Sequence, residues 1–256
     1  PIVPHYLSGI ILNQGDRIMI DKMVGKTEVA LYGLAYSIGM LVQLFISGMN
    51  SALTPWMYSK IKKGDIRSMR KVLQLLSIVV VGIAVALMLI SPELVLIFGS
   101  PKYREAVYVI PPVAASVFFI FIYNILSMPQ FYYEKTQFLM AASMAAAGAN
   151  VVLNFIFIRL FGYIAAGYTT LACYMLYSVG HYIVSKRILV NEGIQENLMS
   201  PGFLVACSVF LIGASIICNL IFPYRILRYA ILLASAGLVF WKKELLLKTM
   251  ADIRKK

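Results

Sequence analysis

Residues 72–98, VLQLLSIVVVGIAVALMLISPELVLIF, decide the fold class because Glu93 is the one charged residue among them. A transmembrane helix needs about 20 predominantly apolar residues to cross the hydrocarbon core of a bilayer. A lipid-exposed segment also has to satisfy its backbone hydrogen bonds internally, and a single segment does so as an α-helix. This stretch therefore predicts a membrane-spanning helix.

Seven further apolar stretches surround this one, and short polar connections separate them. The full set is 2–24, 31–56, 72–98, 107–129, 136–158, 163–185, 202–222 and 226–246. No connection is long enough to hold a domain outside the membrane. The pattern predicts an all-α integral membrane bundle of about eight transmembrane helices, with 202–222 and 226–246 as two peripheral helices.

Composition excludes a soluble protein. Of 256 residues, 61% are hydrophobic and 13% are charged, whereas soluble domains have about 45–50% and about 25%. The net charge of +12 does not indicate a nucleic-acid partner, because the basic residues lie in the connections and at the C-terminus. Cys173, Cys207 and Cys218 all lie in apolar segments, so we interpret them as small buried side chains and not as disulfide or metal ligands.

The distribution of lysine and arginine predicts the topology. One side would carry 15 of them: six in residues 60–71, Lys135, Lys186, Arg187 and six in residues 242–256. The other side would carry seven: Lys22, Lys26, Lys102, Arg104, Arg159, Arg225 and Arg228. Because cytoplasmic loops are enriched in basic residues, both ends of the segment are expected in the cytoplasm.

Polar residues recur at helical spacing within five of the stretches. They are His5, Gly9, Asn13, Asp16 and Arg17; Tyr36, Gln43, Ser47, Asn50 and Thr54; Ser116, Tyr123, Ser127 and Gln130; Ser143, Asn150 and Asn154; and Thr170, Tyr174, Tyr177 and His181. Amides are costly in hydrocarbon unless they are paired or hydrated, so we expect these faces to converge away from lipid. Either they line a hydrated path, or they hold neighbouring helices together without a cavity.

Asp16 and Arg17 are the sharpest signal in these stripes. A charge near the middle of a span costs at least about 2.5–3.5 kcal/mol, and adjacent helical residues point about 100° apart, so the two are not an obvious pair. In one interpretation the helix ends early and both residues lie in the headgroup layer. In the other, Arg17 meets an anionic group in a charged lumen and Asp16 takes up a proton or a cation.

Several other features carry no functional prediction. We expect the last two stretches to lack an intramembrane charge. We expect Glu93, Glu105 and Glu134 to be solvated, and His181 to be a hydrogen-bonded packing residue. The alanine-rich segment 141–149 predicts close helix packing. No sequence motif for phosphate binding, metal binding or nucleophilic catalysis is present, so neither an enzyme, a metal site nor a cofactor is expected.

Two segments resemble a known family. Residues 4–41, PHYLSGIILNQGDRIMIDKMVGKTEVALYGLAYSIGML, and residues 150–174, NVVLNFIFIRLFGYIAAGYTTLACY, are similar to bacterial polysaccharide flippases. These belong to the multidrug/oligosaccharidyl-lipid/polysaccharide exporter superfamily, whose members have two lobes. The resemblance covers the C-terminal half, so residues 1–256 would be a C-terminal lobe: a six-helix lobe at 1–185 and the peripheral helices at 202–246. An N-terminal lobe is expected to be missing.

The resemblance implies a function. Such a protein moves undecaprenyl-diphosphate-linked repeat units of capsule or O-antigen across the bacterial cytoplasmic membrane by alternating access. The implied substrate-path residues are Asn13, Asp16, Arg17, Tyr36, Gln43, Asn50, Asn124, Asn150 and Asn154, and Asp16 is the ion-coupling candidate. The implied partners are the anionic lipid-linked oligosaccharide, membrane lipids, the N-terminal lobe and, as a further candidate, glycan polymerase machinery. No nucleic acid is implied.

Other functions remain open at this point. A lipid II or sporulation-type flippase, or a drug or cation antiporter of the same superfamily, would share the architecture. A membrane glycan polymerase would require large outer loops with catalytic side chains, which this sequence lacks. A membrane scaffold without transport activity would not require aligned amides or a charge within a span.

Overall fold

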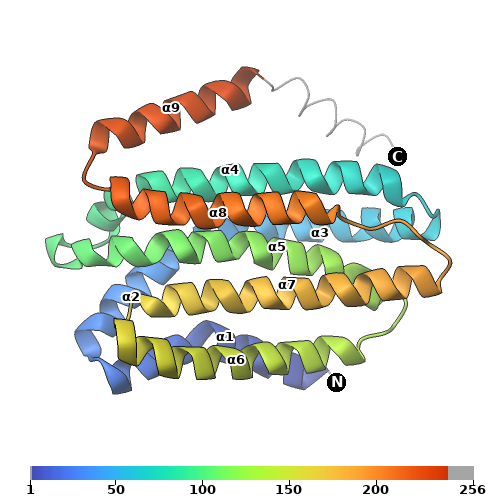
Figure 1. The fold of residues 1–256 in the computed structure, drawn as a ribbon, viewed down its shortest axis with the longest axis horizontal. Coiled ribbons are helices and arrows are strands. Elements are labelled where there is room, and N and C mark those ends of the chain that lie inside the picture. Colours follow the sequence, from blue (N-terminus) through green and yellow to red (C-terminus); the bar gives the residue numbers. More distant parts are fainter. Residues whose placement is uncertain (1, 242–256) are drawn as a thin grey trace.

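The computed structural model describes residues 2–241, without the side chains of residues 2–8, 11–13, 236 and 238–241. Regular structure in this part of the chain is entirely helical (Figure 1). The helices are α1 (Ile2–Met23), α2 (Lys26–Gly39), α3 (Leu41–Lys62), α4 (Ile66–Phe98), the 3₁₀ helix η1 (Pro101–Val109), α5 (Ile110–Tyr132), α6 (Gln137–Phe161), α7 (Ala165–Asn191), α8 (Pro201–Ile221) and α9 (Arg225–Trp241).

The helices match the predicted stretches closely, and the all-α class is confirmed. In the described residues, five segments are long and apolar enough to cross a membrane. They are Lys26–Lys62, Ile66–Phe98, Pro101–Tyr132, Gln137–Phe161 and Pro201–Ile221. For α1, α7 and α9 a membrane crossing stays a prediction. Helices α1 and α7 both carry polar stripes, which lower their mean hydropathy.

The stretch predicted at 31–56 is longer than expected and consists of two helices, with the break at Met40. A Cβ on Gly39 would lie 2.7 Å from Cγ1 of Val113 in α5. The absence of a side chain at Gly39 therefore lets α2 approach α5 closely at the point where the helix breaks. The amide of Met40 bonds to the Tyr36 carbonyl at 2.9 Å, and the amide of Gln43 bonds to the Met40 carbonyl at 2.9 Å where α3 begins.

The long helices run in alternating directions along one axis, with α2 and α3 together forming one pass (Figure 1). The start of α1 and the connections after α3, α5 and α7 lie at the same end of the bundle, as the predicted topology has them. That this end faces the cytoplasm stays a prediction. Helix α5 is central, and its first half is almost fully buried. Helix α6 lies against α1 and α7. The alanines of 141–149, however, line an open cavity of about 470 Å³ beside α7, so the close packing expected of this segment is not confirmed there.

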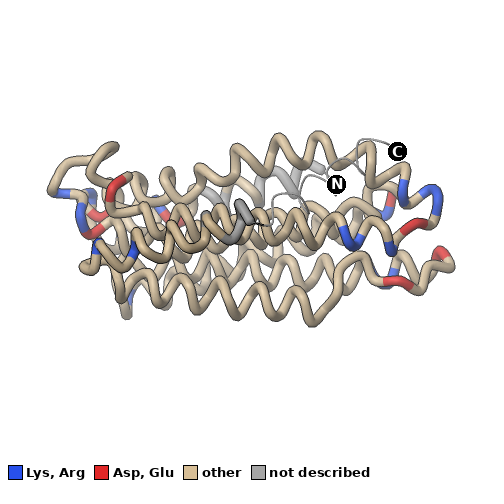
Figure 2. The backbone as a smooth tube through the Cα atoms, turned by 90° about the horizontal axis from the view of Figure 1, so that it is seen from above, with Lys and Arg blue, Asp and Glu red and all other residues tan. Residues whose placement is uncertain are grey.

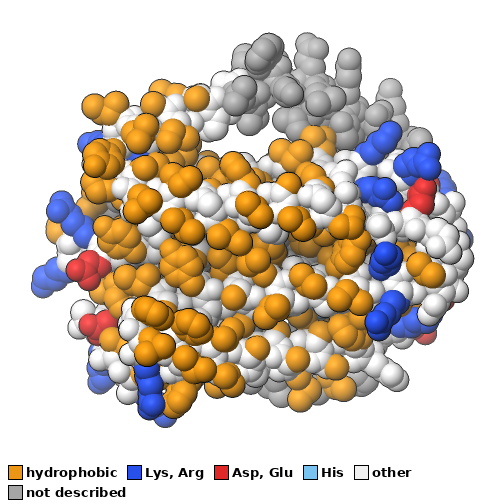
Figure 3. Space-filling model, viewed as in Figure 1, with side chains coloured by type: hydrophobic (Ala, Val, Ile, Leu, Met, Phe, Trp, Pro, Cys, Tyr) orange, Lys and Arg blue, Asp and Glu red, His pale blue; other side chains and the backbone are white. Residues whose placement is uncertain are grey.

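The surface has the character of a membrane protein. Charged residues gather at the two ends of the bundle (Figure 2), and an apolar belt covers the sides (Figure 3). The belt includes large exposed side chains such as Leu44, Val209 and Leu220, which are 73%, 66% and 69% exposed. Exposed apolar area of this extent would aggregate in water and is stable in lipid.

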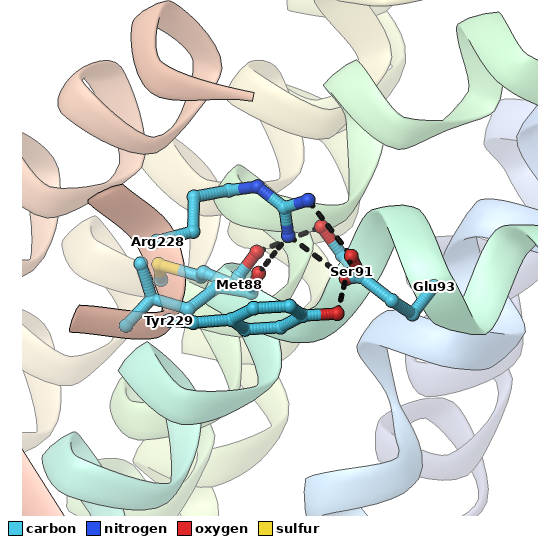
Figure 4. A network of polar contacts seen from close by, with 6 residues as sticks. Met88, Ser91, Glu93, Arg228 and Tyr229 are labelled. Atoms are coloured by element: carbon cyan, nitrogen blue, oxygen red, sulfur yellow. Dashed lines mark hydrogen bonds and ion pairs between the residues drawn. The ribbon is translucent and has the colours of Figure 1, made fainter. Parts of the chain in front are cut away.

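An ion pair between α4 and α9 corrects two expectations from the sequence. Glu93 is not simply solvated, because the guanidinium of Arg228 donates to both of its carboxylate oxygens at 2.8 Å (Figure 4). Arg228 is 3% exposed, so it does not belong to a loop, and α9 carries a buried charge after all. The hydroxyl of Tyr229 donates a third bond to Glu93 at 3.0 Å.

Pro92 explains why the arginine binds at this point of α4. Proline has no amide hydrogen and disturbs the preceding turn of a helix, which leaves carbonyl groups available. The hydroxyl of Ser91 donates to the carbonyl of Met88, and Arg228 donates to the carbonyl of Leu89 at 2.6 Å. Removing one partner of a buried ion pair costs about 3 kcal/mol or more, so this contact helps to hold α9 against α4.

Candidate functional site

Asp16 lies at the centre of a buried network formed by α1, α2, α6 and α7. Helix α1 continues past it to Met23, so the headgroup interpretation is wrong for this residue, which is 0% exposed. One carboxylate oxygen accepts hydrogen bonds from the hydroxyls of Tyr32 at 2.5 Å and Thr170 at 2.8 Å. The other accepts from the amide of Asn154 at 2.5 Å.

A second layer of polar side chains supports this carboxylate. The Asn154 amide nitrogen also donates to Oδ1 of Asn150 at 3.1 Å, and the hydroxyl of Thr169 donates to Oδ1 of Asn154. Among the described residues, no lysine or arginine pairs with Asp16, and Nδ2 of Asn150 has no hydrogen-bond partner. A buried carboxylate can take up a proton, and together with neighbouring oxygen atoms it can also bind a small hard cation.

Arg17 points to a different place, as the 100° rotation along α1 predicts. Its guanidinium donates to Oε1 of Gln14 at 3.0 Å and lies 5.4 Å from the ring centre of Tyr36. In the described part of the chain no carboxylate forms an ion pair with it, and its Nε atom is buried without a hydrogen-bond partner. This cation therefore lacks the neutralising partner that an intramembrane charge normally has.

Arg17 lines an open cavity of about 450 Å³, which we call the Arg17 pocket. Its lining residues are Gln14, Arg17, Tyr36, Ser37, Met40, Gln43, Ile120, Tyr123 and Tyr174. Hydroxyls, amides and one guanidinium form about half of the wall, and no acidic residue is among them. The pocket can bind an anion that also accepts hydrogen bonds.

The Asp16 network and the Arg17 pocket share three helices: they use adjacent residues of α1 and lie one helical turn apart on α2 and α7. Tyr36 follows Tyr32 by four residues in α2, and Tyr174 follows Thr170 by four residues in α7. The rings of Tyr32 and Tyr36 have their centres 5.8 Å apart. A change at Asp16 therefore has a short structural connection to the wall of the pocket.

The structure divides the predicted path residues between these two places. Arg17, Tyr36 and Gln43 line the pocket, whereas Asp16, Asn150 and Asn154 form the buried network. Asn50 and Asn124 are half-buried and are not part of the pocket wall, and the side chain of Asn13 lies outside the described residues. The stripes converge only in part: the Asn150 and Asn154 stripe meets Asp16 and not the pocket, and Ser47 of the α3 stripe is exposed.

Sequence reasoning missed two residues of the network. Tyr32 lies one turn before Tyr36 on the same face of α2, so extending that stripe by four residues would have found it. Thr169 is adjacent to Thr170 but belongs to another face of α7, and its part depends on how closely α6 approaches. No group of three or more His, Cys, Asp or Glu side chains in the described residues could hold a metal ion.

Residues 1–156 match the family model named MatE, which covers more than half of the chain. The chain belongs to the MatE family. MatE proteins are membrane transporters, which agrees with the helical bundle and with a polar pocket inside it. The match includes α1, α2 and α3 and most of α6, and thus Asp16, Arg17, Asn150 and Asn154.

Two relatives from Haemophilus influenzae (strain Rd) are similar to this MatE chain. "Lsg locus putative protein 1" is 28% identical over 152 residues, which cover 56% of the chain and 36% of the relative. "Uncharacterized membrane protein" is 31% identical over 134 residues, which cover 49% of the chain and 32% of the relative. The chain thus spans about a third of the length of these relatives, and no solved structure matches it.

The division into pocket and network predicts different accessibility to thiol reagents. In a variant without the native cysteines, Gln43→Cys should react with a water-soluble thiol reagent, because Gln43 lines the open pocket. Asn154→Cys should be protected, because Asn154 is 0% exposed. Mass spectrometry of membranes labelled before and after denaturation measures both. Rapid labelling of Asn154→Cys in the folded protein would contradict the buried network.

Proposed function

We propose that this MatE chain forms half of a flippase for undecaprenyl-diphosphate-linked oligosaccharides in a bacterial cytoplasmic membrane. The other half would be an N-terminal lobe, and alternating access between the lobes would move the sugar repeat unit outward for capsule or O-antigen synthesis. Both ends of the segment would lie in the cytoplasm. The observation that carries the proposal is the Arg17 guanidinium, which faces an open polar pocket without a carboxylate partner in the described residues.

The chemistry of the pocket supports an anionic, oxygen-rich substrate. A diphosphate cannot cross about 30 Å of hydrocarbon unaided, because its charges would lose their hydration. Arg17 offers charged donors, and the side chains of Gln14 and Gln43 offer amides at the same wall. A drug or metal-cation antiporter would need negative charge where this pocket has a positive one, so the pocket favours the flippase.

The Asp16 network supports ion coupling of that movement. Its carboxylate is buried, accepts three hydrogen bonds and lies one residue from the pocket arginine. Binding of a proton or cation at Asp16 would change the charge inside α1, and thereby the affinity of the neighbouring pocket for an anion. By linkage, binding of the anion would change the affinity for the coupling ion by the same factor.

Reconstitution tests the substrate class. We expect the full-length protein in liposomes to move a fluorescent undecaprenyl-diphosphate oligosaccharide between leaflets, as measured by its accessibility to an added glycosidase. The matched control is the same oligosaccharide on a neutral lipid without the diphosphate, which should not move. Equal movement of both lipids, or of neither, would contradict a pocket selective for the diphosphate.

A further inference from the structure

An open groove separates α8 from α7 on the outside of the bundle. Helix α8 packs against α4 and α5, and in Figure 1 α5 lies between it and α7. The floor of the groove is formed by Phe118, Phe119 and Ile122 of α5, and its walls by residues 175–182 of α7 and 201–212 of α8. The groove has a volume of about 390 Å³.

The walls of this groove are apolar. Apart from Tyr182, the polar side chains among its described lining residues are Ser178 and Ser208. Their hydroxyls donate to carbonyls of their own helices, those of Met175 at 2.8 Å and Leu204 at 2.7 Å. The groove therefore suits a hydrocarbon chain, because a sugar or a peptide backbone would lose its hydrogen bonds there.

The length of the groove matches one acyl chain. Residues 201–212 of α8 extend for about 16 Å, because an α-helix rises about 1.5 Å per residue. The hydrocarbon core is about 30 Å thick, so one leaflet contributes about 15 Å. Another transmembrane helix, which is about 10–12 Å wide with its side chains, would not fit into a groove of about 390 Å³.

The end of the groove at Tyr182 and Pro201 is basic. Nε of Arg70 in α4 donates to the carbonyl of Asn197 at 2.7 Å, in the connection that leads to Pro201. Arg70 is also close enough for its charge to act on Tyr182. Lys186 is exposed and follows Tyr182 by one turn on the same face of α7. On the face shown in Figure 3, basic side chains gather at this end of the bundle.

These basic residues lack acidic partners. In the described part of the chain neither Arg70 nor Lys186 forms an ion pair, whereas both glutamates of the connection after α7 pair with other residues, Lys135 and Arg67. The hydroxyl of Tyr182 is buried at this end without a hydrogen-bond partner among the described residues. Two cations and a hydroxyl donor are suitable ligands for a phosphate group.

We propose that this groove, which we call the α8 groove, binds one anionic phospholipid of the leaflet at the basic end. One acyl chain lies between α7 and α8 on the floor formed by α5, and the phosphate contacts Arg70 and Lys186. The chain fills the space that separates the two helices and thereby supports the peripheral helix α8. The proposal goes beyond the proposed function and does not depend on it.

The position of the α8 groove favours a phospholipid over the transported lipid. The groove and the Arg17 pocket share no lining residue among those described. They also use different faces of α5, with Phe118 and Ile122 in the groove and Ile120 and Tyr123 in the pocket. A lipid in the groove therefore has no direct contact with the pocket that we assign to the diphosphate.

Two tryptophan variants of α8 test the groove. Val205 lines the groove and is 62% exposed, whereas Leu220 is 69% exposed and does not line it. The full-length protein is purified in detergent, and native mass spectrometry measures bound phosphatidylglycerol and bound phosphatidylcholine. We expect the wild type to retain one phosphatidylglycerol in preference to phosphatidylcholine, Val205→Trp to lose it, and Leu220→Trp to behave like the wild type.

Two neighbouring basic residues of α7 test the headgroup contact. Lys186→Gln should weaken the binding of phosphatidylglycerol about fivefold, which is the usual effect of one basic residue on an anionic lipid. Arg187→Gln is the matched control, because Arg187 is also exposed but points about 100° away along the helix. Titration of each variant with the lipid, followed by thermal unfolding, measures the difference.

The outcomes decide between the occupants. Equal retention of phosphatidylglycerol and phosphatidylcholine would overturn the headgroup contact, and wild-type retention by Val205→Trp would overturn the groove. Displacement of phosphatidylglycerol by undecaprenyl diphosphate would assign the groove to the transported lipid and overturn the phospholipid. Loss of phosphatidylglycerol from Val205→Trp with unchanged transport would support the proposal, and this result is independent of whether the Arg17 pocket binds a diphosphate.

Discussion

Replacing Arg17 by alanine is expected to abolish export of the glycan while the protein still inserts into the membrane. The guanidinium is the one charged group among the described residues that line the Arg17 pocket, so the substitution removes the charge that would pair with a diphosphate. Truncating one partner of a desolvated charge pair costs about 2–5 kcal/mol. We therefore expect a loss of about a hundredfold or more in lipid movement, measured in liposomes and as surface glycan in a deletion strain.

Two further variants define the reason for that loss. Arg17→Lys keeps the charge but not the planar set of donors, so it should restore only part of the activity. Arg159→Ala removes an arginine of α6 that lies over the ring of Phe155 and does not line the pocket, and it should leave export unchanged. Normal surface glycan in Arg17→Ala would remove this residue from the mechanism.

Replacing Asp16 by asparagine should have the second largest effect, and on coupling more than on folding. Asparagine has nearly the same shape, so Tyr32 and Thr170 can still donate to its oxygen. Its amide nitrogen would replace the oxygen that accepts from Asn154, so that one hydrogen bond is lost, and no ion can be taken up in exchange for a charge. We expect transport to lose its dependence on the ion gradient and to fall about a hundredfold. Flux measured with and without the gradient tests this directly.

Asp16→Ala would act differently, because it removes the acceptor altogether. The donors of Tyr32, Asn154 and Thr170 would be left without their common partner, and each unsatisfied buried group costs about 1–3 kcal/mol. Thermal unfolding in detergent should therefore show a larger loss of stability for Asp16→Ala, which leaves three donors unpaired, than for Asp16→Asn, which loses only the bond from Asn154. Asp21→Asn, at an exposed position of the same helix, is the control. Gradient-dependent transport by Asp16→Asn would contradict the coupling site.

The sequence was sufficient for much of this architecture, because lipid imposes simple rules on helices. Long apolar stretches located the helices, and the 3.6-residue period identified the faces of α5, α6 and α7 that meet. It also separated Asp16 from Arg17. The period carries no information about the third dimension, however. Whether Asn154 faces a pocket or the buried carboxylate of Asp16 depends on which residue of α1 it meets, 138 positions away in the chain.

Two other features escaped prediction for related reasons. The break at Met40 depends on the close approach of Gly39 to Val113, which no local pattern reveals. The pairing of Glu93 with Arg228 joins residues 135 positions apart, and each alone looks like a charge at the end of an apolar stretch. In both cases a distant partner determines the local structure.

The same pairing bears on how the chain is assembled during synthesis. An arginine in a nascent apolar segment opposes its release into the bilayer unless an acid is already there to receive it. Glu93 emerges from the ribosome long before Arg228 does, and the carbonyl of Leu89 beside it is within reach of the same guanidinium. Helix α4 would thus provide the binding partner that allows α9 to insert. In a variant without Glu93, α9 should therefore stay outside the membrane.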